Sequence, residues 1–155
     1  MLVTNHVLSG AVIGAVTRSP WVAFPLGVAS HLVLDSIPHW GRFDSHERFM
    51  RVAVADGLTG LAAMGLAAAA ARPEERAAVV AGMTGAALPD LNKPSRIFFG
   101  GSPFPRRFDE LHARIQDEAP DRFRSHELVA GAAFVAGFAV ALMGARRARR
   151  VGARS

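Results

Sequence analysis

The sequence has 155 residues, half of them hydrophobic, and a mean hydropathy of +0.21. When its 15 glycines are counted as apolar, about 60% of the chain is apolar, against roughly 45–50% in an ordinary soluble domain. The length excludes a large two-domain enzyme, and the lack of cysteine excludes disulfide frameworks, zinc ribbons and thiol nucleophiles. The formal net charge of +5 would by itself suggest nucleic-acid binding, but the positions of the charged residues along the chain indicate otherwise.

The charged residues are strongly segregated along the chain. Five apolar stretches, together 89 residues, contain only three of the 31 charged side chains. A bilayer imposes this pattern, because a charge at its centre costs at least about 2.5–3.5 kcal/mol. We therefore expect a lipid bilayer as the partner, and no nucleic acid. The stretches are residues 2–17, 20–40, 52–71, 77–90 and 128–145.

The first two stretches are predicted to be helices. Residues 2–17 follow no basic region and precede no clear cleavage site, so we expect this helix to remain in the mature protein. Residues 20–40 begin with Ser19 and Pro20, a typical helix start, and Pro25 is expected to kink the helix.

The later stretches differ in length. Residues 52–71 and 128–145 are comfortable membrane spans, since a span needs about 20 residues. Residues 77–90 are short and suit a partly inserted or well-packed helix. None of the five stretches shows the strict alternation of barrel strands, so the expected fold is an all-α integral membrane bundle of four to five helices.

We expect one membrane helical domain over residues 1–155, with two basic segments. The segment 91–125 is a basic loop, and within it residues 104–124 mix apolar and charged side chains, which predicts a short interfacial helix. The Arg-rich tail at 146–155 follows the last span and is expected to lie in the cytoplasm. The expected location is the cell membrane.

Three acidic residues are the only charged residues inside the apolar stretches, and no lysine or arginine in these stretches neutralises them. A buried carboxylate without a partner takes up a proton or binds a cation. Because histidines lie in or beside the same stretches, we predict a site for a divalent metal, Zn²⁺ or Mn²⁺, which uses both ligand types. The expected ligands are His6, His31, Asp35, His39, Asp56 and Asp90.

The expected topology places these residues at one end of the bundle. If five helices run up and down, the polar ends of all five stretches lie near the same membrane face. His31, Asp35 and His39 follow each other at intervals of four residues, which puts them on one helical stripe. Pro38 is expected to end or bend this helix, so that His39 reaches inward from the turn.

The candidates also have structural interpretations. Asp35 and Asp90 could cap the turns after their helices, and the helix dipole alone favours a carboxylate at Asp56. Four further residues lie outside the predicted ligand set. His126 and Glu127 either join the site or form an ordinary helix start. His46 and His112 are expected to be solvated.

Several short motifs, in order, resemble a known family, the membrane-bound predicted metal-dependent hydrolases. The resemblance covers roughly residues 1–95. A looser likeness is to the zinc-dependent phospholipase C and single-strand nuclease group, in which such residues bind zinc ions that activate water against a phosphodiester. The motifs are Thr4-Asn5-His6 with Gly10, the run from Ser30 to Trp40 with His31, Asp35, Pro38 and His39, then Asp56, and Leu88-Pro89-Asp90.

The resemblance implies a hydrolase, whereas the buried charges predict the metal. Together they favour hydrolysis of a small amphiphilic or phosphoester substrate by metal-activated water, with Asp56 as the expected general base. A non-catalytic metal- or proton-handling membrane protein is the alternative, using the same residues as a relay. A soluble helical bundle is a third interpretation, which the mild hydropathy allows.

Overall fold

The computed structural model describes residues 1–152, and the last three residues of the Arg-rich tail lie outside them. The described chain is all-helical, which confirms the predicted all-α class. Its one isolated β-bridge joins His39 and Glu118. The helices are α1 (Val3–Thr17), α2 (Pro20–Asp35), α3 (His46–Ala70), α4 (Pro73–Ala87), the 3₁₀ helix η1 (Leu88–Leu91), α5 (Asn92–Phe99), α6 (Arg106–Ile115) and α7 (Arg124–Gly152).

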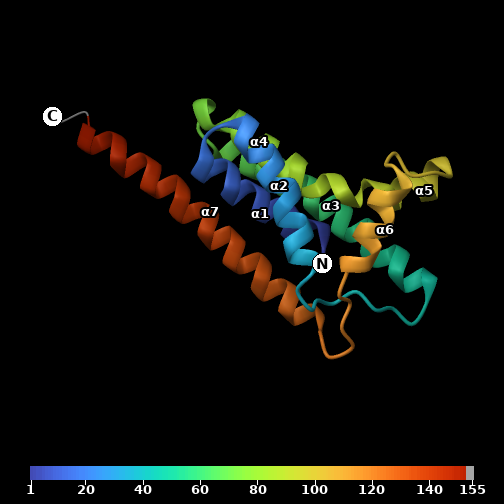
Figure 1. Ribbon diagram of the computed structural model, residues 1–155. Coiled ribbons are helices and arrows are strands. Elements are labelled where there is room, and N and C mark those ends of the chain that lie inside the picture. Colours follow the sequence, from blue (N-terminus) through green and yellow to red (C-terminus); the bar gives the residue numbers. More distant parts are fainter. Residues whose placement is uncertain (153–155) are drawn as a thin grey trace.

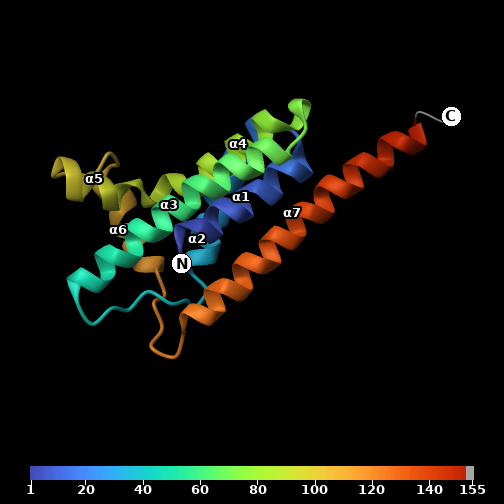
Figure 2. The same cartoon turned by 180° about the vertical axis from the view of Figure 1, so that it is seen from behind.

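Helix α1 is the centre of the bundle. It contacts α2, α3, α4 and α7, the other four long helices of the chain. Figure 1 shows α7 running alongside the bundle, with its C-terminal end extending past the other helices. The reverse view in Figure 2 shows α5 and α6 together at the opposite end from the C-terminus.

Glycines allow α1 and α4 to pack in backbone contact. A Cβ atom added to Gly10 would collide with the backbone of Gly82, and one added to Gly14 would collide with the backbone at Ala78 and Val79. Small residues at this spacing let helix backbones approach closely. Gly10 and Gly14 therefore allow the close approach of α1 and α4.

The buried core is small and consists mainly of alanine, valine and methionine side chains from α1, α3 and α4, joined by Phe138 and Leu142 of α7. In contrast, large apolar side chains cover the outer surface: Trp21 is 89% exposed and Leu66 is 72% exposed. Helix α3 and the part of α7 from Arg124 to Gly144 are long and apolar enough to cross a membrane, and most of their side chains are exposed.

The observed helix ends do not coincide with the ends of the apolar stretches, as α2 and α3 show. Helix α2 ends at Asp35, before Pro38, because proline disfavours helical geometry in the residue before it and cannot continue the helix. Helix α3 begins at His46, six residues before the apolar stretch, where the Ser45 side chain accepts a hydrogen bond from the Arg48 backbone N–H. Within the segment 104–124, residues Arg106–Ile115 form the helix α6.

Substitution of Gly10 by alanine is expected to separate α1 from α4. Overpacking of this kind lowers the free energy of unfolding by about 1–3 kcal/mol. A matched control is Gly65→Ala in α3, since nothing lies within 4 Å of a Cβ atom added there. Denaturant unfolding in detergent, followed by circular dichroism, measures both. Equal stability of the two variants would contradict the close contact.

Candidate metal centre

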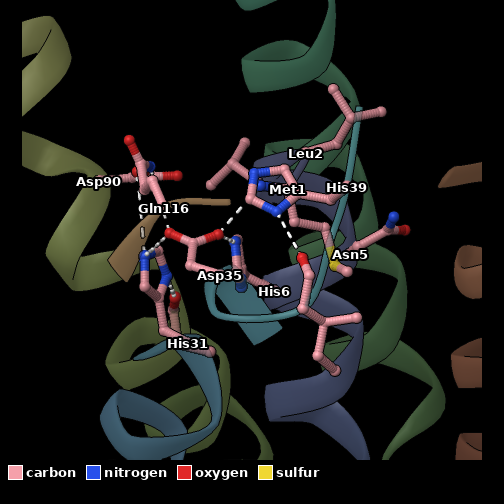
Figure 3. Close-up of polar contacts among 12 residues, drawn as sticks. Met1, Leu2, Asn5, His6, His31, Asp35, His39, Asp90 and Gln116 are labelled. Atoms are coloured by element: carbon pink, nitrogen blue, oxygen red, sulfur yellow. Dashed lines mark hydrogen bonds and ion pairs between the residues drawn. The ribbon is translucent and has the colours of Figure 1, made fainter. Parts of the chain in front are cut away.

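The polar ends of several helices meet at one end of the bundle. His6 comes from the first turns of α1, His31 and Asp35 come from the last turns of α2, and Asp90 comes from η1, directly after α4. His112 arrives from α6. Figure 3 shows Asp35 between His6, His31 and Gln116, with Asp90 close to His31.

The Asp35 carboxylate lies at the centre of this group and is fully buried. Its Oδ1 atom lies 3.0 Å from His6 Nε2 and 2.9 Å from the amino nitrogen of Met1. Its Oδ2 atom lies 3.1 Å from His31 Nε2, 3.0 Å from His112 Nε2 and 3.2 Å from Gln116 Nε2. Three imidazole rings therefore converge on one carboxylate.

The His31 ring is oriented by a backbone contact. Its Nδ1 atom lies 2.7 Å from the carbonyl oxygen of Ala86, which can only accept a hydrogen bond. His31 Nδ1 therefore carries a proton, and in the neutral ring Nε2 has a free lone pair. This lone pair faces the Asp35 Oδ2 atom and His112 Nε2, at 3.1 and 3.0 Å. Such an arrangement requires a proton or a metal cation among these atoms, and metal-binding histidines use this carbonyl contact.

His112 was expected to be solvated, and the structure corrects this prediction, because the residue is only 1% exposed. The neighbouring charged residues Glu110 and Arg114 are exposed, whereas Asp109 and His112 are buried. Phe108, His112 and Ile115 follow each other at intervals of four and three, so they share one helical face. That periodicity was the signal in the sequence that His112 lies on the inner face. His46, by contrast, is exposed as predicted.

Asp90 has a basic partner that the apolar stretches do not contain. Lys93 Nζ lies 2.8 Å from Asp90 Oδ1. The expectation that no lysine or arginine neutralises the three carboxylates is therefore wrong for Asp90. Lys93 stands only three residues further along the chain, at the start of α5 and outside the apolar stretch 77–90.

Four donor atoms lie close enough to bind one ion. They belong to His31, Asp35, Asp90 and His112, and all lie within 4.8 Å of one another. Asp90 Oδ1 lies 3.9 Å from His31 Nε2 and 3.8 Å from His112 Nε2. Tetrahedral zinc with ligands at about 2.0–2.2 Å has neighbouring donors about 3.3–3.6 Å apart. The donor set therefore suits a divalent ion in its chemistry, and Asp90 Oδ1 would move closer to the two histidines on binding one.

Two predicted ligands lie beside this set of four. His6 stacks on His31 with ring centroids 3.9 Å apart, and its Nδ1 atom is buried without a hydrogen-bond partner among the described residues. His39 is also buried, and its Nδ1 donates to the Ile37 carbonyl oxygen. Its Nε2 atom lacks a partner within residues 1–152. His39 does not belong to the four-residue group.

Asp56, predicted as a ligand and general base, contacts the start of α1. Its Oδ2 atom accepts a hydrogen bond from the Val3 backbone N–H at 2.6 Å, and its Oδ1 atom accepts from the Thr4 backbone N–H and hydroxyl. Both oxygens therefore cap the N-terminus of α1, whose free N–H groups favour a carboxylate. Asp56 does not belong to the four-residue group.

Glu127 stabilises the same helix end. Its Oε2 atom accepts from the Leu2 backbone N–H at 3.0 Å and from Asn5 Nδ2 at 2.8 Å. Its Oε1 atom accepts from the Trp40 backbone N–H at 3.3 Å. Glu127 thus links α7 to α1 and to the turn after α2, and His126, which is exposed, takes no part. The pair left open by the sequence is structural.

Asp109 attaches α6, which carries His112, to α5. It accepts hydrogen bonds from Arg96 at 2.8 Å, from Ser102 at 3.0 Å and from Asn92 at 3.2 Å. Burial acts to raise the pKa of Asp109, but these hydrogen bonds and the Arg96 charge hold it below its ordinary value. Asp109 is therefore ionised at neutral pH and holds α6 in place.

Substitution of Asp56 by alanine is expected to weaken the fold and leave the metal site intact. Loss of a helix-capping carboxylate costs about 0.5–2 kcal/mol, measured by denaturant unfolding in detergent. Asp44→Ala is the control, because Asp44 is an exposed acid paired with Arg48. Loss of bound metal in Asp56→Ala at unchanged stability would restore Asp56 as a ligand.

The contribution of Asp109 is expected to depend on pH. Because its folded-state pKa is depressed, its stabilisation is complete above the ordinary aspartate pKa of about 4 and is lost as the pH falls below that value. The difference in thermal midpoint between wild type and Asp109→Asn should therefore shrink from pH 7 to pH 3. Asp121→Asn, at an exposed site, should show no such trend. A constant difference for Asp109→Asn would contradict the assignment.

Comparisons with protein-family models, with curated proteins and with solved structures find no match to this chain. The chemistry of the site therefore rests on its own geometry. That geometry is a buried group of two histidines and two aspartates, with two further histidines beside it.

Proposed function

We propose that the protein is a multi-pass membrane protein with metal-dependent hydrolase activity toward a phosphoester or lipid-like substrate. The observation that carries the proposal is the convergence of His31, Asp35, Asp90 and His112, whose donor atoms all lie within 4.8 Å of one another. The resemblance of residues 1–95 to membrane-bound predicted metal-dependent hydrolases points in the same direction.

The distribution of apolar side chains supports insertion in a bilayer. Two helices have the length and composition of membrane spans, and their side chains are mostly exposed, whereas the core helix of a soluble protein is mostly buried. Apolar side chains also cover α2, where Trp21 and Val33 are exposed. Burial of such a surface in lipid removes it from water, which stabilises the inserted state.

Zn²⁺ or Mn²⁺ is the proposed ion, held by His31, Asp35, Asp90 and His112. When bound, such an ion lowers the pKa of water toward about 7 and polarises a phosphoryl or carbonyl oxygen. The carbonyl oxygen of Ala86 keeps the His31 Nε2 lone pair directed at the site. Gln116 donates to Asp35 Oδ2 and so orients the carboxylate.

His6 is the proposed proton acceptor, in place of Asp56. Its Nε2 atom lies 3.0 Å from Asp35 Oδ1, and a carboxylate oxygen accepts a hydrogen bond, so the proton of the neutral ring is on Nε2. The Nδ1 atom then has a free lone pair, and this atom has no hydrogen-bond partner in the described part of the chain. The pairing with Asp35 stabilises the ring when it becomes protonated.

The surroundings of the site favour an anionic substrate. Arg96, Ser102 and Arg106 line an open hollow of about 520 Å³ next to Asp109, one turn from His112 on α6. Arg106 is highly exposed and contacts only Glu110, so its guanidinium is accessible to a phosphate group. The phosphoester headgroup of an amphiphilic molecule carries a negative charge and lies at the membrane surface, so it suits this arrangement.

A non-catalytic role in metal or proton handling is the second candidate. The observation in its favour is the chain of three imidazoles joined through Asp35, because such a chain also transfers protons. A proton on His31 Nε2 would satisfy the same contacts as a metal ion. Metal content and turnover distinguish the two roles.

The purified protein in detergent is expected to bind one equivalent of Zn²⁺ or Mn²⁺. His112→Ala and Asp35→Ala should each weaken metal binding by more than about 100-fold in isothermal titration calorimetry, since each removes a donor. His46→Ala is the matched control, because His46 is exposed and remote from the four donors. Equal metal affinity in His112→Ala and His46→Ala would contradict the assigned site.

Hydrolysis is tested with bis(p-nitrophenyl) phosphate. Turnover should disappear with a chelator, return with Zn²⁺ or Mn²⁺, and fall by at least about 100-fold in His6→Ala at unchanged metal content. Metal binding without any turnover would favour the non-catalytic role. Absence of both would contradict the whole proposal.

A further inference from the structure

Lys93 is the only lysine of the sequence, whereas seventeen positions are arginine. Its side chain is 39% exposed, and its ammonium group lies 2.8 Å from Asp90 Oδ1. Lysine carries a compact point charge on a flexible stem, whereas arginine has a planar fork that binds carboxylates with two hydrogen bonds. The single lysine therefore lies where its ammonium group contacts one carboxylate oxygen of the metal centre.

The Lys93 ammonium and a metal ion compete for the same atom. Asp90 Oδ1 is the oxygen that lies 3.9 and 3.8 Å from the two histidine Nε2 atoms, and so it is the natural donor to an ion at this centre. An ion at about 2.0–2.2 Å from Oδ1 would repel an ammonium at 2.8 Å from the same oxygen. Binding of the ion therefore favours departure of Lys93 from Asp90.

Lys93 can reach solvent after it leaves Asp90, because its side chain is 39% exposed. The side chain begins at the start of α5, at the edge of the metal centre, and is half-buried. A released ammonium at this edge lies next to any substrate whose reacting atom approaches the ion.

We propose that Lys93 is a substrate-binding residue that contacts an anionic phosphate oxygen, and that Asp90 holds it until a metal ion enters. This inference rests on the proposed metal site and names the group that recognises the substrate. The recognised chemistry is a phosphate oxygen, from a lipid headgroup or from a free phosphate. A lysine ammonium binds such an oxygen as a point charge.

The single lysine makes the first test direct. Protein grown with ¹³Cε-labelled lysine has one lysine Cε signal in its NMR spectrum, from Lys93. Addition of Zn²⁺ to one equivalent should shift this signal and increase its mobility. Subsequent addition of inorganic phosphate, or of phosphatidic acid in the micelle, should shift it again and restrict it. A response to phosphatidic acid alone identifies a lipid source.

Variants provide the second test. Lys93→Met removes the competing charge and should bind Zn²⁺ at least about 10-fold more tightly, while the KM for bis(p-nitrophenyl) phosphate rises at least about 10-fold and kcat changes less. Lys93→Arg keeps the charge and should recover most of the KM. Arg107→Met, in α6 outside the four donors, is the control and should leave the Zn²⁺ affinity unchanged.

Metal content distinguishes a failure of the role proposed for Lys93 from a failure of the proposed function. If calorimetry shows bound Zn²⁺ but the Lys93 signal does not move, or if Lys93→Met binds Zn²⁺ no more tightly, the role of Lys93 is wrong and the metal site stands. If no metal binds to the wild-type protein, the proposed function is wrong, and the role of Lys93 fails with it.

Discussion

One buried carboxylate, that of Asp35, organises this end of the molecule. A carboxylate removed from water is costly unless its oxygens are paired, and here three imidazole rings, one amide and an amino group supply the partners. These partners come from segments far apart in the sequence. The requirement to pair Asp35 therefore fixes the positions of α1, α2 and α6 relative to one another, and brings the donor atoms within reach of one ion.

The sequence was sufficient for the helical class and for about half of the site. Long apolar stretches without strict alternation predicted helices, and the placement of polar residues at alternate stretch ends predicted their convergence. His31 and Asp35, separated by one helical turn, and Asp90 all lie where this pattern places them. These predictions succeeded because they depend on helical periodicity and on charge segregation, which are local properties.

The remainder of the site depends on tertiary contacts that the pattern does not encode. His112 stands in a segment rich in charged residues, where the face it shares with Phe108 and Ile115 is the one local signal, and the packing of α6 on the end of α2 makes this face an inner one. Asp56 stands in an apolar stretch as a ligand would, yet its oxygens satisfy the exposed N–H groups of α1. Local composition does not distinguish a capping carboxylate from a coordinating one.

The attachment of α6 has a consequence for the metal centre. Three of the four donors belong to the helices of the apolar bundle and to η1, whereas the fourth belongs to a short helix that is anchored to α5 by Asp109. Displacement of α6 from the bundle would remove His112 from the group without moving any long helix. Whether the centre has three donors or four is thus set by one short helix and the aspartate that anchors it.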